Sequence, residues 1–83
     1  MSDADRIRAY LRRRFTEAEA KGLSVVCVKA GDAHKALSLS NQVPNVVQVM
    51  RQFLNETHRD FVAKEPPSGQ STDVIYVYHL PRP

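Results

Sequence analysis

Amide and guanidinium side chains recur at helical spacing in the middle of this chain. Residues 31–55 contain two short helical patterns on either side of a turn, and the second begins near Pro44. Proline suits the first turn of a helix because its φ is already fixed near the helical value. Successive helical residues lie about 100° apart. That spacing places four amides, one guanidinium and one valine on a single face: Asn45, Gln48, Val49, Arg51, Gln52 and Asn55.

This face carries the chemistry that reads base pairs. An amide donates and accepts hydrogen bonds side by side, which matches the edge of adenine in the major groove. Arginine matches guanine, and a small apolar group meets the methyl of thymine. Exposed helices also carry Asn and Gln for solubility alone, and that alternative stays open. We interpret this segment as a candidate recognition helix.

The opposite face of the same helix is apolar and is expected to be buried. Before this helix, small apolar residues at positions 33, 36 and 37 predict a short helix over residues 32–38. Small and polar turn formers then occupy residues 38–43, so the two helices are expected to form a helix-turn-helix. The apolar face of the second helix consists of Val46, Val47, Met50, Phe53 and Leu54.

A longer amphipathic helix is expected over residues 3–21. Ser2 or Asp3 suits its N-cap and Gly22 suits its end. The β-branched run at residues 23–29 predicts a strand buried on at least part of both faces, with Cys27 as a small core residue rather than a nucleophile. The apolar positions of the helix are Ile7, Tyr10, Leu11, Phe15 and Ala18.

The last third of the chain predicts two strands joined by a loop. Residues 58–65 alternate loosely around Phe61, and residues 66–71 are rich in Pro, Gly and Ser. Residues 72–80 form the strongest β pattern in the chain. Two such strands predict a hairpin whose tip projects. One face of the last strand carries Val74, Tyr76, Tyr78 and Leu80.

Length and charge favour one small domain with a polyanionic partner. The 83 residues contain no internal repeat or low-complexity tract, so a single domain spanning 1–83 is expected. The net charge is +3, which permits nucleic-acid binding without requiring it. A single cysteine and the lack of a long apolar run predict a soluble, cytoplasmic protein that does not enter a membrane. The first segment concentrates the positive charge in Arg6, Arg8, Arg12, Arg13 and Arg14.

The residue pattern gives little support to enzymatic or metal chemistry. His34, His58 and His79 lie far apart and lack the close spacing of zinc ligands. The segment at residues 68–71, Ser-Gly-Gln-Ser, lacks the Lys-Ser/Thr ending of a phosphate-binding loop. We therefore expect no enzyme activity, no cofactor and no metal.

The order helix, strand, helix, helix, strand, strand resembles the winged helix-turn-helix family. The resemblance covers nearly the whole chain. It rests on this order, on the turn Leu-Ser-Leu-Ser-Asn-Gln-Val-Pro and on the loop Pro-Pro-Ser-Gly-Gln-Ser. It implies an α+β fold with a small three-stranded antiparallel sheet, in which the C-terminal hairpin is the wing.

In that family the third helix enters the major groove, and the wing reaches a neighbouring phosphate or the minor groove. The resemblance therefore implies base contacts from the third helix, backbone contacts from the turn and the wing, and a supporting charge at Lys64. The implied base-reading residues are Asn45, Gln48, Val49 and Gln52, with Arg51 on a base or a phosphate. The implied backbone contacts are Asn41, Gln42, Ser68, Gln70, Ser71 and Thr72.

Two functions of different classes follow. The first is binding of double-stranded DNA without a cofactor, as a small transcriptional regulator or accessory factor. The second is a winged-helix protein-interaction domain, acting as a homodimer or within a larger assembly. The mild net charge and the lack of Arg or Lys at the wing tip suit this second function. RNA binding ranks third, because the sheet has no evident row of exposed aromatic residues on which bases stack.

Overall fold

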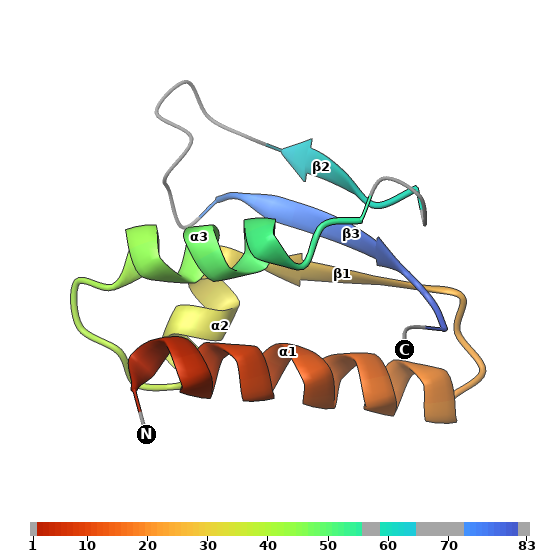
Figure 1. Cartoon of the computed structure of the whole chain (residues 1–83), viewed down its shortest axis with the longest axis horizontal. Helices are drawn as coiled ribbons and strands as arrows, with labels where there is room; N and C mark the ends of the chain where they lie inside the picture. The colour runs from red at the N-terminus through yellow and green to blue at the C-terminus, as the bar shows by residue number, and fades with distance from the viewer. Residues whose placement is uncertain (1, 56–58, 65–72, 82–83) are drawn as a thin grey trace.

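The structure, a computed structural model, describes residues 2–55, 59–64 and 73–81. This part of the chain forms an α+β fold of three helices and three strands in the expected order (Figure 1). The elements are α1 (Asp3–Ala20), β1 (Val25–Lys29), α2 (Ala30–Ala36), α3 (Val43–Gln52), β2 (Phe61–Lys64) and β3 (Ile75–His79). The predicted strands at 58–65 and 72–80 are therefore confirmed over their central residues.

Helix α1 begins and ends where its capping residues predict. Ser2 accepts a hydrogen bond from the Asp5 amide, and the Asp5 carboxylate accepts one from the Ser2 amide, which satisfies two amides at the start of the helix. At the other end Gly22 adopts φ +77°. The amides of Gly22 and Leu23 then bond to the carbonyls of Glu19 and Ala18, at 2.9 and 3.0 Å. A residue with a Cβ would be strained in this left-handed conformation, whereas glycine adopts it freely. Gly22 therefore determines where the helix ends.

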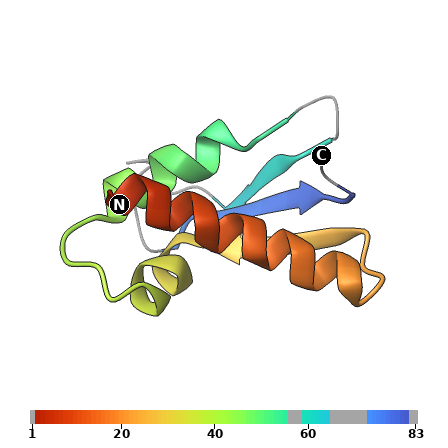
Figure 2. The ribbon, with the colours of Figure 1, turned by 60° about the horizontal axis from the view of Figure 1, so that its bottom comes forward.

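The three strands form one antiparallel sheet with β3 in the centre, in the order β1-β3-β2. Val77 of β3 is the register partner of both Cys27 in β1 and Phe61 in β2. The helices cover one face of this sheet, as two views of the molecule show (Figures 1 and 2). Alternate strand residues such as Val28, Tyr76 and Tyr78 are fully buried beneath the helices.

The other face of the sheet is open, which corrects one expectation. Cys27 is exposed, and so are Val25 and Phe61, whose exposed fractions are 40% and 51%. The prediction that β1 is buried on at least part of both faces, with Cys27 as a core residue, is therefore wrong for Val25 and Cys27 on the open face. Among the described residues no second layer covers this side, so β1 alternates between buried and exposed positions despite its continuous apolar sequence.

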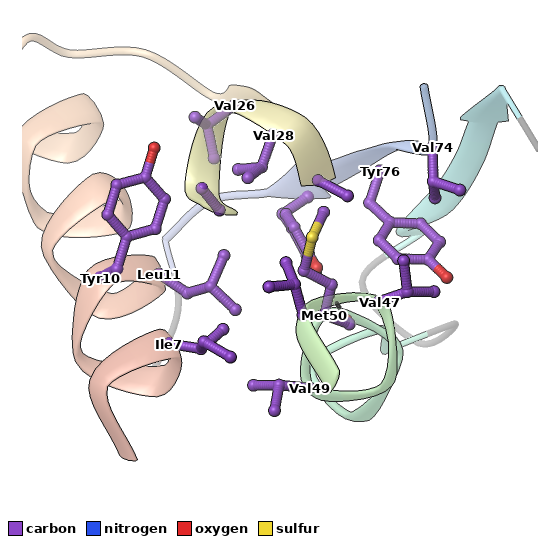
Figure 3. Close-up of a cluster of buried hydrophobic side chains, with 14 of the residues drawn as sticks. Ile7, Tyr10, Leu11, Val26, Val28, Val47, Val49, Met50, Val74 and Tyr76 are labelled. Carbon is purple, nitrogen blue, oxygen red and sulfur yellow. Dashed lines mark hydrogen bonds between the residues drawn. The ribbon is translucent and has the colours of Figure 1, made fainter. Parts of the chain in front are cut away.

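The core lies between the covered face of the sheet and helices α1 and α3. Apolar side chains from all three meet there, including Leu11, Val28 and Met50 (Figure 3). At one end three aromatic rings join the layers. The Phe15 ring packs edge-on against the rings of Tyr78, at a centroid distance of 5.0 Å, and Phe53, at 6.0 Å.

A buried carboxylate ties the end of α3 to the sheet. Asp60 lies just before β2, and only 6% of it is exposed. One of its oxygens accepts the His79 amide of β3 at 2.7 Å, and the other accepts the Asn55 amide at 2.9 Å. Hydrogen bonds to a charged acceptor stabilise more than neutral ones. Asp60 therefore fixes where the chain leaves α3 and enters the hairpin.

We expect Asp60→Ala to lower the free energy of unfolding by about 3 kcal/mol, because it leaves two partly buried amides without their acceptor. Urea denaturation followed by circular dichroism measures this loss. The matched control is Asp73→Asn, since the Asp73 carboxylate is 56% exposed and lies 3.7 Å from Lys29. We expect the control to change stability by less than about 0.5 kcal/mol. Equal effects of the two variants contradict the structural role of Asp60.

Candidate nucleic-acid interface

The outer surface of α3 presents the amides predicted for it. Gln48, Arg51 and Gln52 are exposed, and Asn45 is half-buried. They point outward because Val46, Val47 and Met50, on the other side of the helix, are buried with exposed fractions of 1% or less. Phe53 and Leu54, which follow the helix, are half-buried against the same core. The predicted division of α3 into an apolar and a polar face is thus confirmed for these residues.

Val49 is the exception. The sequence placed it with the outward amides, but only 2% of it is exposed, and its side chain points towards Ile7 of α1 (Figure 3). Val49 lies only about 60° around the helix from Val46. Helix α1 packs against that flank of α3, so the buried arc of α3 is wider than one apolar stripe. Val49 is a core residue, and its predicted contact with a base edge is wrong.

The turn before α3 is held by its own hydrogen bonds. Gln42 is the N-cap residue of α3 and makes no side-chain capping bond. Instead its backbone amide donates to His34 Nε2 at 3.2 Å, and its side-chain Oε1 accepts from the side-chain Nδ2 of Asn45 at 3.3 Å. Asn41 is exposed with φ +53°. His34 therefore links α2 to the start of α3, a role that the sequence pattern gave no reason to expect.

The arginines of α1 divide between two flanks of that helix. Arg12 lies on the α3 side, with its guanidinium carbon 5.7 Å from the centre of the Phe53 ring. Arg8 is one helical turn before Arg12 and so shares this flank. Both precede Phe15, the residue that packs against Phe53. These two arginines border the amide face, and no signal in the sequence alone assigned them to it.

Arg8 forms an ion pair with Asp5, which partly neutralises its positive charge. Its Nη1 lies 3.0 Å from Asp5 Oδ1. Hydrogen bonds from Ser2, first through its side chain and then through its backbone, hold the pKa of Asp5 below its ordinary value, and Arg8 adds to this effect. Asp5 is therefore ionised at neutral pH. Arg12, in contrast, presents an exposed guanidinium beside α3.

Arg13 and Arg14 lie on the other side of α1. Arg14 donates to the Tyr10 hydroxyl at 3.0 Å and to the Cys27 carbonyl at 3.2 Å. The guanidinium of Arg13 lies over the Tyr10 ring at 5.8 Å from its centre. A ligand that covers the outer surface of α3 meets Arg8 and Arg12 but not this second pair. The run of three arginines therefore does not act as one basic patch.

The predicted wing is described only in part. Strands β2 and β3 pair antiparallel, as a hairpin requires, and Lys64 is exposed at the end of β2. The predicted contacts Ser68, Gln70, Ser71 and Thr72 lie outside the described residues. The candidate interface, as far as the structure describes it, therefore consists of the amide face of α3 with Arg51, together with Arg12 and Arg8 on one flank.

Comparison with protein-family models, with curated protein sequences and with solved structures finds no match. Within the described residues, no helix is both long enough and apolar enough to cross a membrane. In the same part of the chain, no three His, Cys, Asp or Glu side chains come together as metal ligands. Any functional conclusion therefore depends on the site itself.

Substitutions in α3 distinguish buried from outward positions. We expect Val49→Ala to lower the free energy of unfolding by about 2 kcal/mol, because it removes two buried methyl groups and leaves a cavity. Gln48→Ala, at the adjacent exposed position, is the matched control and is expected to change stability by less than about 0.5 kcal/mol. Urea titration of both variants measures the difference. A Val49→Ala protein as stable as the control contradicts the assignment of Val49 to the core.

Proposed function

We propose that this chain is a DNA-binding winged-helix module that reads the major groove with α3. The observation that carries the proposal is the outward row formed by Gln48, Gln52 and Asn45, with Arg51 beside it, on a helix whose other faces are packed. A helix of this size fits the major groove, and its amides match the edge of adenine. The module acts in this proposal as a small cytoplasmic transcriptional regulator or accessory factor.

The arrangement of the elements supports the winged-helix part of the proposal. The chain that follows α3 returns as the β2–β3 pair, and β1 completes the sheet beside β3. In Figure 1 the end of β2 and the start of β3 lie at the same end of the molecule as the start of α3, on the left of the view. A hairpin in that place grips phosphates beside the groove that α3 occupies. Lys64 supplies a positive charge at the end of β2.

The charges near α3 support binding to a duplex. Arg12 and Arg51 lie on opposite sides of the amide row, since Arg12 belongs to the α1 flank and Arg51 follows Val47 around α3 towards the sheet. Phosphate strands border the major groove on both sides. Base contacts then come from the amides in the middle, and affinity comes from arginines at the edges.

Protein interaction is the second candidate function. The open face of the sheet favours it, because Val25 and Phe61, two exposed large apolar residues of the described chain, lie on this face. Exposed apolar patches often mark association sites. In this alternative the module forms a homodimer or joins a larger assembly through the sheet, and the amides of α3 serve only for solubility.

The proposed DNA reading is tested by Gln48→Ala and Gln52→Ala. A preferred duplex is first selected from random sequences, and affinity is measured by fluorescence anisotropy for that duplex and a scrambled one. We expect each variant to lose about 1 to 3 kcal/mol for the selected duplex, a factor of about 5 to 150, with little change for the scrambled one. Failure to select any preferred duplex, or unchanged preference in both variants, contradicts the proposal. Self-association that is insensitive to salt favours protein interaction.

The two flanks of α1 give an independent test. The logarithm of a DNA affinity falls linearly with the logarithm of salt concentration, with a slope near −0.9 for each phosphate contacted. We expect Arg12→Ala to make this slope shallower by about 0.9, because Arg12 borders α3. Arg13→Ala, one residue further and on the other flank, is the control and is expected to leave the slope unchanged. If Arg13→Ala changes the slope and Arg12→Ala does not, the duplex lies on the other flank of α1, and the proposed interface is contradicted.

A further inference from the structure

A second candidate site lies on the flank of α1 that faces α2. It is a pocket of about 310 Å³, lined by Arg6, Ala9, Tyr10, Arg13 and Leu37. Its volume is at the lower end of the range for small-molecule sites. The four α1 residues form one continuous strip of that helix, on the side away from Arg8 and Arg12. A ligand here is therefore independent of the proposed DNA surface.

Two guanidinium groups stand at the two ends of this pocket. Arg6 and Arg13 are two helical turns apart, so they lie at nearly the same angle around α1 and about 10 Å apart along its axis. Arg6 Nη2 donates to the Leu37 carbonyl at 2.7 Å, and its Nη1 reaches Asp3 only at 3.5 Å. The Glu17 carboxylate lies 3.8 Å from Arg13 Nε, beyond hydrogen-bond distance.

Both guanidinium groups have a carboxylate neighbour, but no carboxylate lines the pocket itself. The side chains of Arg6 and Arg13 are 41% and 65% exposed. A guanidinium offers five N–H donors in a planar fork, which matches a carboxylate or a phosphate. The pocket is therefore rich in hydrogen-bond donors on two sides.

The floor between the two arginines is apolar. It consists of Ala9, Leu37 and the ring of Tyr10, which is only 7% exposed. The Tyr10 hydroxyl accepts a hydrogen bond from Arg14, and that bond fixes the ring. Both Arg13 and Arg14 lie over this ring, at 5.8 and 5.9 Å from its centre. The floor is thus an apolar surface against which a small hydrophobic group can pack.

We propose that this pocket binds a small organic anion, in which an oxyanion group is attached to an apolar body. The oxyanion, a carboxylate or a phosphate, accepts hydrogen bonds from Arg13, and the apolar body covers Ala9 and Leu37 in the direction of Arg6. An inorganic ion satisfies only the first requirement. Because Arg6 also holds the carbonyl at the end of α2, the occupied site includes the junction between α1 and α2.

The test uses the whole chain and four probes: benzoate, phenyl phosphate, acetate and inorganic phosphate. Nitrogen-15 NMR follows the backbone amides of residues 6, 9, 10, 13 and 37 and the Nε–H groups of the arginines. We expect benzoate or phenyl phosphate to shift these signals saturably in the millimolar range, at least about tenfold more tightly than acetate or inorganic phosphate. Whichever aromatic probe binds more tightly identifies the preferred oxyanion.

Arg13→Gln is the decisive variant, because Arg13 is largely exposed and its loss is compatible with folding. We expect it to weaken binding of the aromatic probe about tenfold. Arg12→Gln, the same substitution at the neighbouring residue outside the pocket, is expected to leave binding unchanged. The proposal is overturned if neither aromatic probe gives a saturable shift, if the inorganic ion binds as tightly as the aromatic one, or if the two variants behave alike.

Discussion

The hydrogen bond from the Tyr78 hydroxyl to the Met50 carbonyl, 2.7 Å long and buried, is the contact on which the arrangement of the molecule depends. It joins the central strand to the last full turn of α3. The ring that carries the hydroxyl also packs on Phe15 of α1. One residue of β3 therefore touches both long helices. A bond of this kind sets the rotation of α3 about its own axis as well as its position, because the accepting carbonyl lies at one defined point on the helix.

The functional surface follows from that rotation. If α3 turned by one residue, about 100°, the amides would enter the core and the valines would face water. Met50 and Val46 on one side, and Val49 against α1, oppose any such turn because all three are buried. Asp60 then holds the chain that leaves the helix, through the amides of Asn55 and His79. Gln48 and Gln52 thus point outward because the packing of the core fixes the rotation of α3, not because of contacts made by the amides themselves.

Local patterns in the sequence predict the elements well and the partners of individual residues poorly. Helix α1 follows from its apolar spacing, its Ser2 cap and Gly22, and β3 follows from alternation around Tyr76 and Tyr78, because these signals come from neighbouring residues. The sequence prediction fails for Val49 because its burial depends on α1, a helix that is distant from it in the chain. Cys27 was misplaced for a related reason: a short apolar strand has the same sequence whether one or two of its faces are covered.

The electrostatic details of the candidate sites needed the structure. The sequence shows that arginines crowd the first helix, but only the packing against α3 and α2 assigns Arg12 to one flank and Arg13 to the other. Asp60 gave no signal at all, because a buried carboxylate and an exposed one look the same in a sequence. Its role depends on two amides that are five and nineteen residues away.

Arg14 has a consequence for how copies of this protein behave towards one another. Strand β1 is an edge strand of the sheet. The backbone hydrogen bonds from Ala30 to Val74 and from Leu80 to Ser24 show that the even-numbered residues of β1 direct their N–H and C=O groups towards β3. The Cys27 carbonyl therefore points away from the sheet, where a strand from another molecule would attach. Arg14 occupies this carbonyl with a charged donor. A strand from another molecule would have to displace Arg14 before it could pair with β1. The side chain therefore protects this edge of the sheet against aggregation.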